Sequence, residues 1–230
     1  MGEPPALVVC GHGTRDAQGR AVVAATVEAV AARLPGVAVH EAYVDVHGPE
    51  VDGVVAGLPP RPDGSRAGVV VPLLLAAGYH VRVDLAQAVQ ERPDVVVTAA
   101  LGPDDRLVDL LLERVEQVGG VHDGDAVVLA PAGSSDERAQ EASAETARRL
   151  GERLGRPVRL GYAAGPRPPA ACAVTTARVE GAERVLLVSY LLAPGFFQRR
   201  LEACGADVVT APLLPDERVV DVVLERYRSA

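Results

Sequence analysis

The chain has 230 residues, a formal charge of −8 and a hydrophobic content of 48%. That content is sufficient for a packed core, and the length fits one large α/β domain or two small ones. The acidic balance argues against a nucleic-acid-binding protein, which needs a basic face to neutralise phosphates. Because only 3% of the residues are aromatic and Trp is absent, a base-stacking surface is not expected either.

The first residues contain no basic segment followed by an apolar one, and no stretch approaches the length of a membrane span. We therefore expect a cytoplasmic protein without a membrane partner. Three cysteines, Cys10, Cys172 and Cys204, lack a Cys-x-x-Cys spacing, which fits a reducing compartment and argues against a structural zinc site.

Apolar strand-like runs alternate with helical stretches along the first half of the chain. This βαβα alternation predicts a parallel sheet with helices on both faces. The glycine-rich segment 119–124 interrupts the alternation and is the expected domain boundary. The expected strands are 7–10, 37–44, 68–74 and 95–98, and the expected helices are 17–34, 49–57, 81–90 and 105–118.

Three blocks of the second half repeat blocks of the first half in the same order. Such an internal match predicts that one ancestral fold has been duplicated. The matching pairs are 7–16 with 126–136, 71–80 with 188–197, and 98–109 with 210–221.

The duplication predicts an α/β protein of two similar lobes, residues 1–121 and residues 122–230. Each lobe is expected to contain a four-stranded parallel sheet in the flavodoxin-like order 2-1-3-4. Ligands of such sheets bind at the carboxyl ends of the strands, so these ends are where we look for function.

Two histidines distinguish the first lobe from its duplicate. His12 follows the first strand in Gly-His-Gly-Thr-Arg-Asp, where flanking glycines allow a sharp turn and Asp16 is expected to cap the next helix. His80 follows the third strand, and the duplicate has Ala132 and Phe197 at the two equivalent positions. In the 2-1-3-4 order, strands one and three are neighbours, so both imidazoles should face one crevice.

Two neutral imidazoles that leave coordination positions open suit an ion that must be bound and then released. We therefore expect His12 and His80 to bind metal and to carry catalysis, since an imidazole also accepts a proton near neutral pH. The alternative is that each histidine is a helix-capping or ordinary loop residue. His40 and His122 lack this placement, and His47 could either reach the crevice or lie on the surface.

Three motifs carry a resemblance to a known family: 11–15 (Gly-His-Gly-Thr-Arg), 42–45 (Ala-Tyr-Val-Asp) and 72–84, which ends in Gly-Tyr-His-Val-Arg-Val-Asp. They resemble the class II tetrapyrrole chelatases of the CbiX and SirB type, in the long, internally duplicated form. The resemblance implies ATP-independent insertion of Fe²⁺, or as second choice Co²⁺, into sirohydrochlorin, in sirohaem or cobalamin biosynthesis. It places the reaction in a cleft between the lobes.

The resemblance also implies roles for single residues. The metal-handling histidines of the family map onto His12 and His80, and Asp45, where the family commonly has Glu, is a candidate third metal ligand. No tightly bound cofactor is implied, because Fe²⁺ or Co²⁺ is a substrate.

The substrate implied by the resemblance is a polycarboxylate, which an acidic protein must recognise by local groups. Arginine pairs with carboxylates in a two-bonded fork, and the start of a helix also accepts an anion. For each arginine the alternative is a solvated surface charge, and for each apolar residue a place in the core. The candidates for substrate binding are Arg15, Arg82, Ser134, Ser135, Phe197 and Arg199, with Arg200, Leu192 and Phe196 nearby.

The leading interpretation is a monomeric sirohydrochlorin chelatase, a lyase that binds no nucleic acid. The alternative is a two-lobed metal or tetrapyrrole carrier without catalysis, since duplicated α/β lobes also suit ligand capture.

Overall fold

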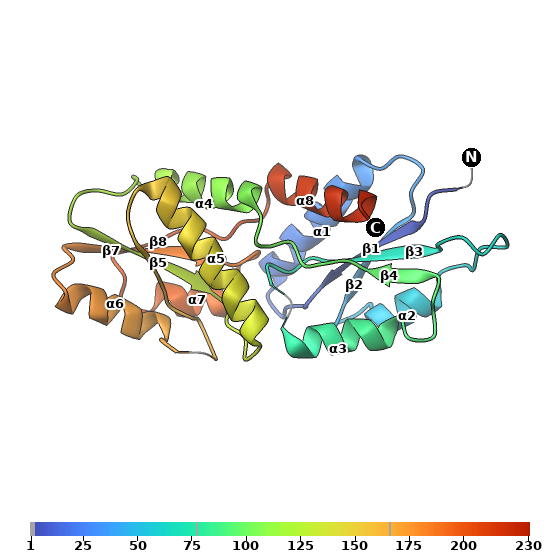
Figure 1. The fold of residues 1–230 in the computed structure, drawn as a ribbon, viewed down its shortest axis with the longest axis horizontal. Coiled ribbons are helices and arrows are strands. Elements are labelled where there is room, and N and C mark those ends of the chain that lie inside the picture. Colours follow the sequence, from blue (N-terminus) through green and yellow to red (C-terminus); the bar gives the residue numbers. More distant parts are fainter. Residues whose placement is uncertain (1–2, 77, 166) are drawn as a thin grey trace. The chain divides into compact units, whose positions relative to one another are not determined.

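The computed structural model describes residues 3–76, 78–165 and 167–230, except for the side chains of Tyr79 and His80. Strands and helices alternate along the chain (Figure 1). Among the described residues, no helix combines the length and the apolar character needed to cross a bilayer. The elements are β1 (Ala6–Gly11), α1 (Ala17–Ala32), β2 (Val39–Tyr43), α2 (Val51–Ala56), β3 (Gly68–Pro72), α3 (Tyr79–Ala88), β4 (Val95–Val97), α4 (Asp105–Gln117), β5 (Asp125–Pro131), α5 (Glu137–Leu154), β6 (Val158–Leu160), α6 (Ala170–Val179), β7 (Arg184–Tyr190), α7 (Phe196–Glu202), β8 (Val208–Val209) and α8 (Glu217–Arg228).

The strands form two parallel sheets with the same topology. The first four strands have the order β2-β1-β3-β4, and the last four have the order β6-β5-β7-β8. Leu7 of β1 lies opposite Val39 of β2 and Val69 of β3, and β5 pairs with β6 and β7 in the same way. The α/β fold of two similar four-stranded lobes and the predicted strand order are confirmed.

The central strands of the first sheet are buried along their length. Leu7, Val8 and Cys10 of β1 are fully buried, and so is every residue of β3. Figure 1 shows α1 and α8 on one face of this sheet and α2 and α3 on the other. Because neither face of these strands meets water, they appear in the sequence as continuous apolar runs without polar alternation.

An aspartate carboxylate caps the amino end of four helices at matching places of the two repeats. Each carboxylate accepts a hydrogen bond from a backbone N–H group in the first turn, which satisfies a donor that has no partner within the helix. In α1 the bond runs from Gly19 N to Asp16 at 3.0 Å, so the predicted cap is confirmed. The four residues are Asp16, Asp104, Asp136 and Asp216.

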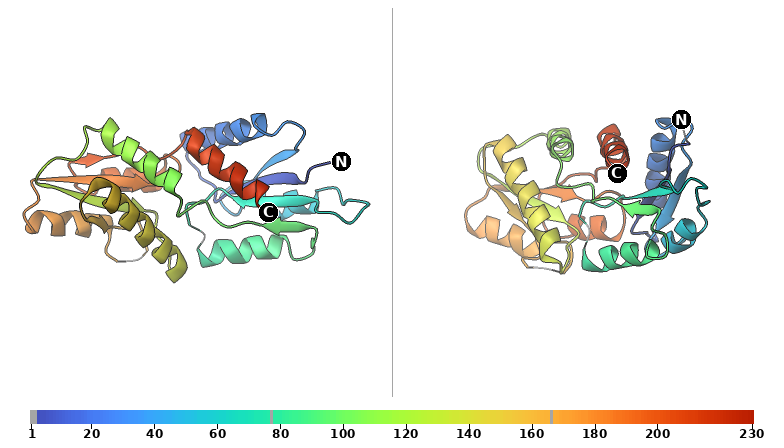
Figure 2. Two further views of the ribbon diagram at one scale, coloured as in Figure 1. Left: turned by 45° about the horizontal axis from the view of Figure 1, so that its top comes forward. Right: turned by 45° about the vertical axis from the view of Figure 1, so that its right-hand side comes forward.

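The compact units of the structure differ from the sequence repeats in their last helix. Unit 1 runs to Leu101 and resumes from Pro215 to Ala230, whereas unit 2 consists of Gly102–Leu214. Helix α8 therefore lies in unit 1, beside α1 (Figure 2), and α4 lies in unit 2, against α5 and β7. The predicted lobes, 1–121 and 122–230, follow the sequence repeats, and the compact units differ from them by one helix each.

Helices α4 and α8 are exchanged, because each packs in the unit formed mainly by the opposite repeat. Each carries an arginine at the equivalent position that binds that repeat. In unit 1, Arg226 of α8 donates to the carbonyl oxygens of Ala100 (3.2 Å) and Leu101 (3.1 Å). In unit 2, Arg114 of α4 donates to the carbonyl oxygens of Pro212 (3.0 Å) and Leu213 (3.0 Å). Each helix thus satisfies the strand-end loop of the opposite repeat, while its apolar face covers the sheet there.

A pair of matched core substitutions tests this division. Leu224 of α8 and Leu111 of α4 are both fully buried, so replacing either with Ala is expected to cost about 2–5 kcal/mol of stability. Leu224→Ala should raise amide hydrogen exchange in β1 and β3, and Leu111→Ala should raise it in β5 and β7. Faster exchange in β5 and β7 for Leu224→Ala would contradict the assignment of α8 to unit 1.

Candidate functional site

The loop after β1 and the loop after β2 lie together at the carboxyl edge of the unit 1 sheet. The backbone N–H groups of Val44 and Asp45 donate to the carbonyl oxygens of Gly11 and His12, each at 3.1 Å. Parallel pairing therefore continues past the ends of both strands. It holds the backbone of His12 while the side chain of His12 stays exposed.

Both glycines beside His12 lie close to the second loop, and the approach is closest at Gly13. A Cβ atom on Gly11 would lie 3.2 Å from Cε1 of Tyr43. On Gly13, where φ is +100°, a Cβ atom would lie 2.1 Å from the carbonyl oxygen of Asp45. The Gly-His-Gly triplet is therefore a packing requirement as well as a turn.

Asp45 is exposed, and its carboxylate accepts a 2.6 Å hydrogen bond from the N–H of Val46. The neighbouring backbone bond to the His12 carbonyl keeps Asp45 next to His12. One oxygen of the carboxylate is used by the turn, which leaves the other for a ligand.

His47 lies partly buried in the second loop, with its ring against the ring of Tyr43 at a centroid distance of 4.0 Å. Nδ1 of His47 donates to the carbonyl oxygen of Gly48 at 3.1 Å, with the tautomer assigned from that bond. Its Nε2 is buried and has no hydrogen-bond partner among the residues that the structure describes. His47 thus packs against Tyr43 within its own loop, and whether its ring reaches the proposed crevice stays a prediction.

A half-buried carboxylate, that of Glu41, adjoins this loop. The hydroxyl of Tyr43 donates to Glu41. Burial raises the pKa of the Glu41 carboxyl, and the nearby imidazole of His47 partly offsets that rise. Glu41 was not among the sequence candidates, because a single acidic residue in a strand gives no sign that a tyrosine and a histidine will gather around it.

The backbone brings His80 to the same edge of the sheet. His80 is in the first turn of α3, after Gly78 and the end of β3, and β3 is hydrogen-bonded to β1. Arg82 is half-buried two residues further along α3, and Arg15 is exposed beside His12. The side chain of His80 lies outside the described residues, so the convergence of the two imidazoles stays a prediction.

The remaining candidates lie at the equivalent edge of the unit 2 sheet. The Ser134 hydroxyl accepts a 3.1 Å hydrogen bond from Asp136 N, as Thr14 does from Asp16 N in unit 1, so it forms part of the helix start. Ser135 and Arg199 are exposed.

The two phenylalanines after β7 have different environments. Phe197 is half-buried and packs against the core of unit 2, whereas Phe196 is 61% exposed. Their rings meet edge to face at 5.5 Å. Phe196 is therefore the more exposed of the two rings, and Phe197 packs beneath it against the core.

The described side chains contain no group of three or more His, Cys, Asp or Glu residues that could hold a metal ion, a search that leaves out His80. Cys10, two residues before His12, is buried, and burial raises the pKa of its thiol to about 12. The thiol is therefore neutral near pH 7 in the absence of a metal ion.

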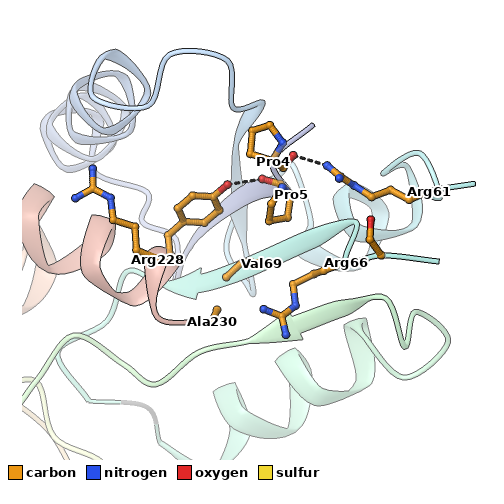
Figure 3. Close-up of a pocket in the computed structure, with 9 residues that line it drawn as sticks. Pro4, Pro5, Arg61, Arg66, Val69, Arg228 and Ala230 are labelled. Carbon is orange, nitrogen blue, oxygen red and sulfur yellow. Dashed lines mark hydrogen bonds between the residues drawn. The ribbon is translucent and has the colours of Figure 1, made fainter. Parts of the chain in front are cut away.

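A pocket of about 470 Å³ opens elsewhere in unit 1, at the amino edge of the sheet (Figure 3). It lies near the start of β3 and the end of α8, where the hydroxyl of Tyr227 donates to the Pro5 carbonyl at 2.6 Å. None of the predicted site residues lines this pocket. The residues that line it are Pro4, Pro5, Arg61, Ser65, Arg66, Val69, Tyr227, Arg228 and Ala230.

The contact between Gly13 and Asp45 is tested by Gly13→Ala, with Gly36→Ala as the control. Gly36 also has a positive φ, +84°, but a Cβ atom there would meet nothing within 4 Å. We expect Gly36→Ala to cost about 1 kcal/mol of stability from backbone conformation alone. Gly13→Ala should cost about 1–3 kcal/mol more from overpacking, measured by thermal or urea unfolding. Equal losses would show that the two loops are not in contact.

The state of Cys10 is tested by alkylation with iodoacetamide at pH 8. Exposed Cys172 should be modified in the native protein, whereas Cys10 should react only after unfolding, because its thiol is buried and protonated. Mass spectrometry of peptides from native and unfolded samples gives the result. Native-state labelling of Cys10 at the rate of Cys172 would contradict its burial.

Comparison with known proteins identifies relatives over the full extent of both repeats. The CbiX family model matches residues 6–118 and 126–230, which confirms the internal duplication. The sirohydrochlorin ferrochelatase of Priestia megaterium is 25% identical over 205 residues, 85% of this chain and 76% of that protein. The sirohydrochlorin cobaltochelatase of Sulfolobus acidocaldarius is 28% identical over 114 residues, 48% of this chain and 89% of that protein.

Solved structures share the fold. SirB from Bacillus subtilis with Fe³⁺ has a TM-score of 0.79 at 21% identity, over 98% of this chain and 95% of that one. The structure of CbiX described as the terminal enzyme of sirohaem biosynthesis in denitrifying bacteria has a TM-score of 0.70 at 20% identity, over 98% and 99% of the two chains. With the family model matched along both repeats, the chain belongs to the CbiX family.

Proposed function

We infer that this protein is a chelatase that inserts a divalent metal ion, Fe²⁺ or Co²⁺, into sirohydrochlorin. The observation that carries the inference is the exposed His12 at the carboxyl end of central strand β1. It belongs to a chain whose two repeats both match the CbiX family, and the relatives are named as ferrochelatase and cobaltochelatase of the same tetrapyrrole.

The reaction exchanges one M²⁺ ion for the two pyrrole N–H protons of the macrocycle. His12 and His80 hold the partly dehydrated ion through neutral imidazole nitrogens, and Asp45 is the third ligand. As the ion passes to the ring nitrogens, an imidazole that it leaves accepts a pyrrole proton and releases it to water. An exposed His12 suits both steps, because a weakly held ion must depart and a proton must reach solvent.

The carboxylates of sirohydrochlorin bind to positive or N–H-rich groups at the carboxyl edges of the two sheets. Arg15, Arg82 and Arg199 supply guanidinium forks, and Ser134 and Ser135 begin α5, where free N–H groups accept an anion. Phe196, supported by Phe197, supplies an apolar contact for the ring. The cleft expected between the lobes stays a prediction, as do the monomeric state and the cytoplasmic location.

Iron remains the first choice of metal and cobalt the second. The ferrochelatase relative aligns with 85% of this chain and the cobaltochelatase relative with 48%. Both ions accept imidazole ligands, so the ligand types do not separate them. The metal is a substrate in either case.

The test is an anaerobic assay of sirohydrochlorin with Fe²⁺ or Co²⁺, followed by the change in absorbance. Metal insertion should be faster with the wild-type protein than without protein, and each protein molecule should convert many molecules of sirohydrochlorin. His12→Ala and His80→Ala should each lower kcat about 100-fold or more, because each removes a metal ligand and proton acceptor. Since His12 is exposed, His12→Ala should leave the melting temperature nearly unchanged.

His122→Ala is the matched control, because His122 is exposed between the repeats and its ring hydrogen-bonds to the nearby Gly119 carbonyl. It should keep wild-type activity. Stoichiometric binding of sirohydrochlorin or metal without turnover would instead establish the carrier alternative. Full activity in both His12→Ala and His80→Ala would remove the proposed chemistry from this edge of the sheet.

A further inference from the structure

We propose that Val46 is a specificity-determining residue that contacts the flat apolar face of the tetrapyrrole, an inference that rests on the proposed function. Val46 has a φ of +72° and is the one non-glycine residue with a positive φ in the described part of the chain. This left-handed region strains a β-branched side chain, because Cβ crowds the backbone carbonyl. A strained residue of this kind calls for a reason outside its own turn.

The turn itself is tight and well defined. The N–H of His47 donates to the carbonyl oxygen of Asp45 at 2.9 Å, which closes a three-residue γ-turn with Val46 at its centre. The N–H of Val46 is bound by the Asp45 carboxylate. Val46 therefore cannot relax to a negative φ without breaking the turn that adjoins His12.

The second repeat contains the same backbone pairing, with glycine at the position equivalent to Val46. Ala163 N donates to Pro131 O at 3.0 Å and Ala164 N to Ala132 O at 2.8 Å, as Val44 and Asp45 do beside His12. The next residue, Gly165, has a φ of +76°. The second repeat thus has a positive φ at this position without a side chain, because glycine adopts that φ without strain.

The side chain of Val46 is also not used by the core. It is 39% exposed, one of three large hydrophobic residues with high exposure in the described chain, together with Val179 and Phe196. Its Cβ lies 3.1 Å from the position that a Cβ on Gly13 would take, which places it directly beside His12.

An exposed apolar group at a metal-binding edge, kept in a strained turn, fits contact with an apolar ligand surface. The ring face of a tetrapyrrole offers that surface, and a branched side chain touching it beside His12 would hold the ring against the bound ion. Val46 acts on substrate binding and orientation, and it takes no part in proton transfer.

The test measures stability and insertion kinetics for Val46→Gly, Val46→Asn and Val46→Ile. Glycine and asparagine both accept a positive φ, so both should raise the melting temperature, Val46→Gly by about 2–6 °C. Both remove the apolar contact, so both should raise KM for sirohydrochlorin about 3- to 10-fold with kcat changed less than about twofold. Val46→Ile keeps a branched apolar group and should retain a KM near the wild-type value.

Two controls separate strain from contact. Val179→Ala truncates an equally apolar exposed residue in unit 2 and should leave KM unchanged. Gly165→Ala introduces a side chain at the equivalent turn, where a Cβ atom would have its nearest neighbour at 3.9 Å, and should lower the melting temperature.

An unchanged KM in Val46→Gly and Val46→Asn, with an active wild-type protein, would overturn the proposal for Val46 and leave the proposed function intact. A lower melting temperature for Val46→Gly would also overturn it, since the side chain would then serve the fold. If metal insertion is no faster with the wild-type protein than without protein, the proposed function fails. The Kd of the protein for sirohydrochlorin then tests whether Val46 contacts the ring. Equal Kd values for wild type and Val46→Gly would then overturn the contact.

Discussion

The candidate site depends on the backbone pairing that continues beyond the ends of β1 and β2. Two N–H···O bonds, from Val44 to Gly11 and from Asp45 to His12, fix the main chain on both sides of the imidazole. The contact is close enough that position 13 has no room for a Cβ atom. A fixed main chain with an exposed side chain preorganises the His12 imidazole without enclosing it. A metal ion that must be released requires such an open position.

The two repeats show which features belong to the scaffold and which to the chemistry. Both have the loop pairing, a residue with a positive φ directly after it and an aspartate that caps the helix after the first strand. They differ where unit 1 has His12 and Val46 and unit 2 has Ala132 and Gly165. Because the backbone pairing forms with either set, the scaffold does not require the side chains of His12 and Val46.

Each repeat depends on the last helix of the other repeat for part of its packing. Arg114 and Arg226 each bind the carbonyl oxygens of a loop that follows the last strand of the opposite repeat. A repeat alone would leave those carbonyls and one face of its sheet without this cover, since unpaired buried polar groups and exposed apolar faces are both unfavourable. The duplication therefore yields two units that each need a helix from the other half of the sequence.

The sequence by itself determined the α/β class, the duplication, the strand order, the Asp16 cap and the placement of His12 and His80 at strand ends. These features follow from local rules: apolar runs for buried strands, turn residues at their ends and the fixed side on which parallel strands terminate. Tertiary structure alone decided which unit receives α4 and α8, the gathering of Tyr43 and His47 around Glu41, the burial of Phe197 instead of Phe196, and the strained turn at Val46. Each of these depends on contacts between segments distant in sequence or on a backbone dihedral, and neither quantity is encoded in the periodicity of a single segment.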